Sequence, residues 1–295
     1  MGWQTYTLTY RARSPVLLGD HPYGFIQRTR LYAPGWTLWG AITARLTRAL
    51  LPRAAGPDYE AVGTFVAENL RTSYAFLLVD EQRAAPRYAA GRLHYGPLPA
   101  ADFEARFLAS LGQTAVAPAT LSAHTGALHE TEVLTSHDPV TGEAVRWQFA
   151  LYAQQPWRDL PASLDGLTTG DVLFALSELS LGADRGYGLG RMTLEGAADG
   201  PHPVEGEETG PCPLEWDPQG RTLAAHVPLD AFPGDWVRGR AESIPWRWWQ
   251  NDPGGAWGPG QRSQVRLFYV PGSIVEAQGW QPVVGPYGIW EVADG

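Results

Sequence analysis

The amino-acid sequence predicts an α+β sandwich. Residues 3–13 alternate between apolar and polar side chains as a strand does, whereas apolar residues after Pro34 recur every three or four positions as in an amphipathic helix. Over residues 1–196 the order of such patterns is strand, helix, strands, helix, strand. This order is typical of the ferredoxin-like type, so we expect residues 1–196 to form one domain of that type.

Each element of this region is predicted from its own pattern. In 3–13 the apolar positions are 6, 8 and 10, and a polar loop is expected at 19–24. Apolar positions 38, 42, 46 and 49 form one stripe of the first helix, with Arg45 and Arg48 off that stripe and Thr37 as the expected N-cap. A later helix is expected to open at 168–171 and to run through Leu179.

The remaining elements follow in order. We expect a helix at 58–71, a strand at 73–79, a loop or hairpin at 83–99, a helix at 103–111, strands at 129–136 and 145–153 joined by a turn at 138–142, and a short strand at 192–195. The stretch 197–210 is rich in Gly, Pro and Glu and is the expected linker. Residues 211–295 hold eight of the 13 tryptophans, with strands expected at 221–228 and 265–270, and are predicted to form a second, β-rich lobe.

Length and composition limit the classes of protein that the chain can represent. Its 295 residues are 44% hydrophobic and 18% charged, which is typical of a globular protein with one large domain or two medium ones. No apolar run is long enough to span a bilayer, and the first residues do not resemble a secretory signal. Cys212 is the sole cysteine, which excludes an intramolecular disulfide and a multi-cysteine metal site. We therefore expect a cytoplasmic protein.

The charge is unevenly distributed. The formal net charge is −9, yet residues 1–53 hold seven arginines and one acid, Asp20. All 22 basic residues are arginine, the side chain best suited to forked contacts with phosphate, although a GC-rich genome would produce the same bias. The total charge argues against loose, nonspecific nucleic-acid binding, whereas its distribution allows a local basic face on an acidic body.

Residues 182–191 form the most informative segment. It carries four glycines, which let backbone amides approach a ligand closely, with Arg185 and Arg191 as flanking charges and Tyr187 as a stacking face. Such a loop suits a phosphate backbone. Its glycine spacing differs from the dinucleotide fingerprint, the loop is expected to leave a helix for a strand, and the absence of lysine excludes a Walker motif. The alternative is a tight helix-to-strand turn.

Two segments together resemble a known family. The segment 182–191, GADRGYGLGR, resembles the C-terminal glycine-rich loop of the RAMP superfamily, the repeat-associated proteins of CRISPR effector complexes. The segment 34–42, PGWTLWGAI, resembles the entry to the first helix of these proteins, and 137–144 is a weaker match. The order and separation of the motifs fit one RAMP unit of about 190 residues, whereas 197–295 carries no motif of the family.

The resemblance implies a modified RNA-recognition-type domain that binds CRISPR RNA (crRNA). The sequence of 37–42, TLWGAI, most resembles that of the subunit that caps the crRNA 5′ tag in type III effectors. The implied role is therefore a structural one in antiviral defence, and it requires no catalytic group, cofactor or metal. Implied partners are crRNA, backbone RAMP subunits, a large subunit and, indirectly, target nucleic acid. The expected RNA-binding residues are Gly182, Arg185, Gly186, Tyr187, Gly188, Gly190 and Arg191, with Arg28, Arg30, Arg45 and Arg48 extending the basic face.

Other functions stay open from the sequence. Asp20 lies where backbone members of the superfamily keep an acid that cuts target RNA, and its alternative role is to close a turn. His21 is the candidate base of a crRNA-processing endoribonuclease. Residues 83–95 are either a hairpin over the RNA or a surface loop. Outside the family, the tryptophans at 246, 248 and 249 predict a carbohydrate-binding β protein, or else a core or subunit interface.

Overall fold

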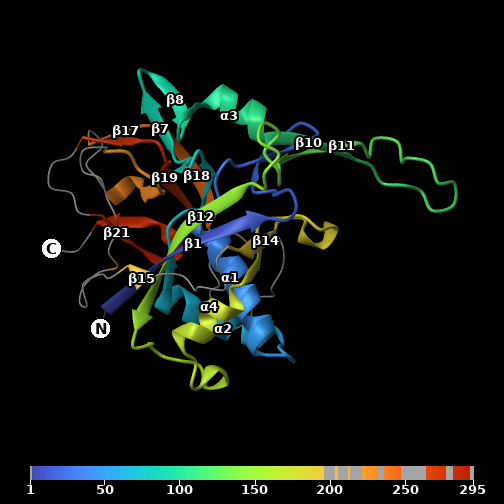
Figure 1. Cartoon of the computed structure of the whole chain (residues 1–295). Helices are drawn as coiled ribbons and strands as arrows, with labels where there is room; N and C mark the ends of the chain where they lie inside the picture. Colours follow the sequence, from blue (N-terminus) through green and yellow to red (C-terminus); the bar gives the residue numbers. More distant parts are fainter. Residues whose placement is uncertain are drawn as a thin grey trace.

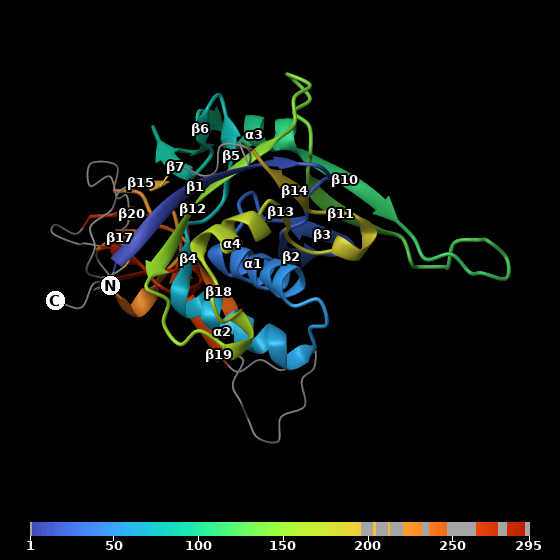
Figure 2. The same ribbon diagram turned by 60° about the horizontal axis from the view of Figure 1, so that its bottom comes forward.

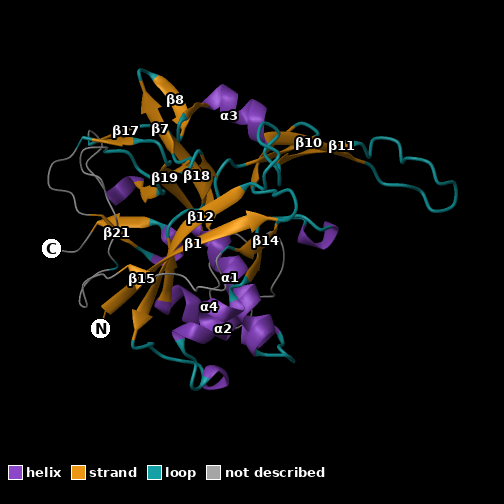
Figure 3. Ribbon diagram, in the orientation of Figure 1, coloured by secondary structure: helices purple, strands orange, loops and turns teal. Residues whose placement is uncertain are grey.

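The computed structural model of the chain describes residues 2–195, 203–204, 212, 221–231, 236–246, 264–276 and 282–292. These residues form several sheets and four α-helices, which confirms the predicted α+β class (Figures 1 and 3). Within the described ranges, no helix combines the length and the apolar character needed to cross a bilayer.

The largest sheet is built around β1 (Gly2–Ala12), which pairs with β12 along its whole length. Burial along β1 alternates as the sequence predicts, with Leu8 and Tyr10 fully buried and Thr7 exposed. The strand order is β13-β14-β1-β12-β5-β6, with β15 also paired to β1 and β4 to β12. The bounds are β4 (Leu70–Thr72), β5 (Phe76–Val79), β6 (Gln82–Arg83), β12 (Arg146–Gln155), β13 (Glu178–Ser180), β14 (Arg191–Leu194) and β15 (Pro203–Val204).

Three helices pack together beside this sheet: α1 (Gly35–Leu50), α2 (Gly56–Asn69) and α4 (Thr169–Ala175) (Figure 1). The stripe residues Leu38, Ile42 and Leu46 of α1 are fully buried in the main core, as their spacing predicts, whereas Ala49, the last position of the predicted stripe, is exposed. In α4 the capping box is closed, because the backbone N–H of Asp171 donates to the Thr168 hydroxyl at 3.1 Å and the Asp171 carboxylate accepts from the Thr168 N–H.

A second sheet, β10-β11-β3-β2, extends away from the body of the molecule, and both views show its β10–β11 connection as a long arm (Figures 1 and 2). The strands are β2 (Gly19–Tyr23), β3 (Ile26–Thr29), β10 (Leu108–Gln113) and β11 (His129–Leu134). A small sheet of β7 (Pro86–Ala89), β8 (Arg92–Tyr95) and β9 (Leu98–Pro99) precedes α3 (Ala100–Phe107) and confirms the hairpin option for 83–99.

The C-terminal strands pack against the first part of the chain. They pair as β16-β19-β18, β17-β20 and β21-β22, and Tyr32, Tyr74 and Phe76 share one apolar cluster with Leu223 and other C-terminal residues. Their bounds are β16 (Val227–Pro228), β17 (Val237–Arg238), β18 (Ala241–Trp246), β19 (Gln264–Tyr269), β20 (Ile274–Val275), β21 (Pro282–Val284) and β22 (Trp290–Val292). Of the expected linker 197–210 only β15 is described, so the division into 1–196 and 211–295 stays a prediction.

Several local predictions are wrong, most of them where pairing with another strand decides. The expected helix 58–71 ends at Asn69, since 70–72 pair with β12, and of the expected strand 221–228 only β16 is a strand. The N-cap of α1 is Pro34 rather than Thr37. The expected loop 19–24 is largely the strand β2, which is held by backbone pairing with β3. Its side chains are almost all exposed, so the sequence carries no alternation of apolar and polar residues that would predict a strand. The expected helix 103–111 ends at Phe107, since 108–113 pair with β11. The helix expected to run through Leu179 ends at Ala175, because 178–180 pair with β14.

Candidate nucleic-acid interface

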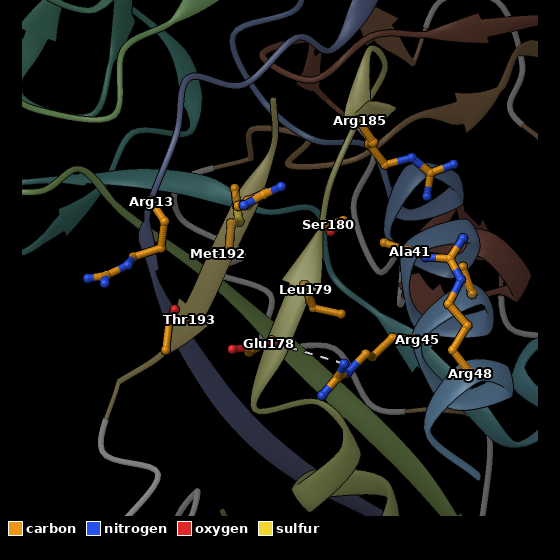
Figure 4. A pocket seen from close by; sticks show the side chains of 12 residues that line it. Arg13, Ala41, Arg45, Arg48, Glu178, Leu179, Ser180, Arg185, Met192 and Thr193 are labelled. Atoms are coloured by element: carbon orange, nitrogen blue, oxygen red, sulfur yellow. Dashed lines mark ion pairs between the residues drawn. The ribbon is translucent and has the colours of Figure 1, made fainter. Parts of the chain in front are cut away.

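Five arginines from three segments of the chain line one groove between α1, β13 and β14 (Figure 4). The groove has a volume of about 410 Å³, and Glu178 is the one acidic residue that lines it within the described part of the chain. In Figure 4 the elements follow one another as β14, β13 and α1, with Arg13 on the far side of β14 and Arg45 and Arg48 on the helix. The arginines are Arg13, Arg45, Arg48, Arg185 and Arg191.

The burial of α1 explains the direction of two of these side chains. Because its apolar stripe faces the core, Arg45 and Arg48 lie off that stripe and face the groove. Arg13 follows directly after β1, and its backbone N–H donates to the carbonyl of Arg191 at 2.7 Å. This bond holds the end of β1 beside the end of the glycine-rich loop, so Arg13 and Arg191 both line the groove, with the Arg13 side chain turned to the far side of β14 (Figure 4).

Three of the four loop glycines have positive φ angles, which favour glycine, and close contacts also exclude a side chain at two of them. Gly182 and Gly190 both have positive φ angles, 86° and 74°, and a Cβ atom on either would overlap a backbone carbonyl oxygen, that of Leu17 or of Leu181. The loop is held there by hydrogen bonds from Ala183 N–H to the Leu17 carbonyl and from Gly190 N–H to the Pro15 carbonyl, both 2.8 Å. Only glycine fits these positions.

The centre of the loop faces open space. A Cβ atom on Gly186 or Gly188 would meet no atom within 4 Å, although the φ angle of Gly188, 91°, favours glycine, and Gly186 lies within the short 3₁₀ turn Arg185–Tyr187. The Tyr187 side chain is 84% exposed, so its ring is available for stacking. The loop joins β13 to β14 rather than a helix to a strand, which corrects the expectation from the sequence.

The groove holds both anchored and free guanidinium groups. Arg45 Nε donates to the Ala175 carbonyl at 2.7 Å, and its Nη1 lies 4.0 Å from Glu178 Oε2. Within the part of the chain that the structure describes, the side chains of Arg13, Arg185 and Arg191 have no hydrogen-bond or ion-pair partner. Their unpaired donors leave the groove with a net positive charge that suits a phosphate group or another anion.

Arg28 and Arg30 lie outside this groove, so the single basic face expected from residues 1–53 is divided. Arg28 pairs with Glu132 at 3.3 Å, and the Arg30 side chain is only 14% exposed. Arg30 forms ion pairs with Asp20 at 3.3 Å and with Glu242 at 2.8 Å. Arg30 therefore connects β3 to the C-terminal strand β18.

This connection continues into a buried histidine. His226 is fully buried; its Nε2 lies 2.7 Å from Glu242 Oε1, and its Nδ1 lies 2.7 Å from the Tyr74 hydroxyl. Burial raises the pKa of the Glu242 carboxyl, but the hydrogen bond from His226 and the charge of Arg30 outweigh this and lower that pKa to about 2. Burial lowers the pKa of His226.

The alternative catalytic residues do not line the groove. Asp20 and His21 lie on β2, where the Asp20 carboxylate is 3.1 Å from His21 Nδ1 and is also paired to Arg30. Among the described residues no group of three His, Cys, Asp or Glu side chains is arranged to hold a metal ion.

Other sequence predictions fall elsewhere. The β7–β8 hairpin, which covers most of 83–95, packs near α3 rather than over the groove (Figure 1). Of the tryptophan cluster, Trp246 ends β18, whereas 247–249 lie outside the described residues. Arg13 is the groove residue that sequence reasoning omitted from the site. The sequence gives little indication of this role. A single arginine after a strand can be assigned to the site only once β1 and the glycine-rich loop are known to be adjacent.

Comparisons with known proteins establish the fold. No protein-family model matches the chain, and no curated protein matches it. A chain from the cryo-EM structure of the Type III-B Cmr-beta complex bound to cognate target RNA and AMPPnP aligns with a TM-score of 0.51 and 10% identity, over 91% of this chain and 85% of that chain.

Chains from Cmr-beta with cognate target RNA and from its apo state align with TM-scores of 0.41, at 12% and 11% identity, over 64% and 65% of this chain and 96% of those chains. A TM-score of 0.41 does not establish a shared fold, so the assignment depends on the first structure. The chain therefore shares its fold with a chain of a type III-B Cmr-beta complex.

Proposed function

We propose that this chain is an RNA-binding subunit of a type III CRISPR effector complex and that its arginine groove holds the 5′ tag of crRNA. The convergence of five arginines on one groove is the observation that carries this proposal. The shared fold with a chain of a complex bound to target RNA supports it. In this role the protein acts by binding, in the cytoplasm, beside other subunits of the complex.

The topology supports the finer assignment to a ferredoxin-like RAMP domain. The strands β14, β1, β12 and β5 are neighbours in that order, and all three pairings are antiparallel. The helix α1 follows β1, and α4 follows β12. This is the strand order 4-1-3-2 of a βαββαβ unit, with the glycine-rich loop leading into its last strand.

The chemistry of the groove fits a single RNA strand. Free guanidinium groups bind phosphates with paired N–H donors, and the exposed ring of Tyr187 offers a stacking face to a base next to the groove. The net charge of −9 over the whole chain limits this attraction to the groove. The acidic remainder of the surface then suits contacts with arginine-rich partner subunits.

The first experiment co-expresses the protein with the products of neighbouring genes, isolates it through one tag and sequences the bound RNA. Short RNAs with a shared 5′ sequence and variable spacers are the expected result. Protein free of RNA and of partners would refute the proposal. Adding target RNA to the complex, with Asp20→Ala as the variant, tests whether the subunit also cleaves.

A second experiment tests the groove itself. The double variant Arg185→Ala/Arg191→Ala should bind single-stranded RNA more weakly, and the slope of log affinity against log salt should decrease by about 1.4, because two phosphate contacts are lost. The matched control is Arg92→Ala, an exposed arginine on β8 outside the groove. Equal slopes for wild type and the double variant would show that the groove does not hold the RNA backbone.

A further inference from the structure

A second, larger hollow lies on the other side of α1. It has a volume of about 790 Å³ and lies between α1 and α2, where Trp39, Tyr59 and Tyr287 contribute aromatic side chains and Gly40, Gly56 and Gly63 contribute almost none. We call this cavity the aromatic hollow.

The walls of the aromatic hollow are fixed by their own contacts. The indole Nε1 of Trp39 donates to the Gly63 carbonyl at 2.9 Å, and the rings of Trp39 and Tyr287 meet edge to face with their centres 5.2 Å apart. Gly63 lets the Trp39 ring lie close to α2, since a Cβ atom on it would lie 3.2 Å from that ring. The polar N–H of Trp39 is thus satisfied, and rigid ring surfaces are left to face the hollow.

Gly40 gives an independent indication that this space is used. It lies in the interior of α1, where glycine is less favourable than alanine, yet a Cβ atom on it would meet nothing within 4 Å. Packing within the described chain therefore does not require glycine at this position. The absence of a side chain at Gly40 leaves the hollow open at this point, and this space is available to a ligand.

The aromatic hollow adjoins the arginine groove across a single helix. Ala44 lines both cavities. Arg48 lines the groove, and its Nε lies 3.4 Å from the hydroxyl of Tyr59, which lines the hollow. A chain of linked phosphates in the groove therefore passes within one residue of the hollow, and a base attached to that chain can reach the aromatic rings.

Charge decides which part of a nucleotide suits each cavity. Among the residues that the structure describes, Glu60 is the one charged residue in the lining of the aromatic hollow, so a phosphate is disfavoured there and favoured beside the arginines. A neutral, flat, partly polar group is favoured instead. We propose that one nucleobase of the RNA whose backbone lies in the arginine groove turns over α1 and stacks in the aromatic hollow, an inference that rests on the proposed function.

The test uses the full chain and oligouridylate of about 12 nucleotides that carries fluorescent 2-aminopurine at one position, moved along the strand. Quenching at one or two adjacent positions is expected for the wild type. Gly40→Leu fills the hollow from a position with open space, so it should fold normally, abolish that quenching and weaken binding by about 5- to 100-fold with an unchanged salt slope. Tyr59→Leu is the second variant and should act in the same direction.

Arg185→Ala is the matched control. It should lower the salt slope while the quenching at saturating protein is retained. If RNA binds with the expected salt slope but no position is quenched, or if Gly40→Leu binds as the wild type does, the aromatic hollow takes no base and the groove proposal still stands. If oligouridylate does not bind at all, both proposals fall.

Discussion

The buried contact between Arg30 and Glu242 yields a prediction whose size follows from the structure. The side chains of Arg30, Glu242 and His226 are 14%, 10% and 0% exposed, and Glu242 accepts from both of the others at 2.7–2.8 Å. Glu242→Ala removes the shared acceptor. The imidazole then stays buried without a carboxylate to bind, and the guanidinium keeps, among the described carboxylates, only that of Asp20, at 3.3 Å.

The magnitude is set by the group that remains unpaired. Loss of one partner from a buried ion pair typically lowers the free energy of unfolding by about 3–5 kcal/mol, much more than the loss of an exposed pair. Because total stability is about 5–15 kcal/mol for most domains, the variant should stay folded at 25 °C with a large part of its stability lost. Arg30 would then be a structural residue and not an RNA ligand.

Urea unfolding, followed by tryptophan fluorescence, measures this loss. The matched control is Glu132→Ala, which removes the partner of Arg28, a side chain that is 51% exposed, and should change the free energy of unfolding by less than about 1 kcal/mol. A loss below about 1 kcal/mol for Glu242→Ala as well would refute the reasoning. It would show that water or another acceptor reaches Arg30 and His226.

Three further changes test separate parts of the fold. Because the folded-state pKa is lowered for His226 from 6.5 and for Glu242 from 4.5 to about 2, the unfolded chain binds protons first. Stability should therefore fall as the pH drops below about 6.5 and decrease further toward pH 2; a flat urea-unfolding profile would contradict this. In the same assay Gly182→Ala should lower the free energy of unfolding by at least about 2 kcal/mol, whereas Gly186→Ala should change it by about 0.5 kcal/mol or less. Equal losses of stability in the two variants would disprove the distinction between the two positions. Thr168→Ala opens the capping box of α4 and should lower the free energy of unfolding by about 1 kcal/mol in thermal unfolding; an unchanged midpoint temperature would contradict this.

The sequence by itself determined the elements whose signals are local. The alternation in β1, the buried stripe of α1 from Leu38 to Leu46 and the start of α4 at 168–171 depend on residues a few positions apart, and each was found where it was predicted. The same periodicity placed Arg45 and Arg48 off the buried stripe. The glycine-rich loop was visible for the same reason, since its glycines are close together in the chain.

Tertiary structure decided which distant residues meet. Arg13 and Arg30 look alike in the sequence, yet one enters the groove with free donors and the other is buried against Glu242. The ends of α3 and α4 were set by strands that pair with 108–113 and 178–180. Local periodicity specifies a backbone conformation, whereas burial, charge pairing and cavities arise from contacts between residues far apart in the chain, which no local pattern records.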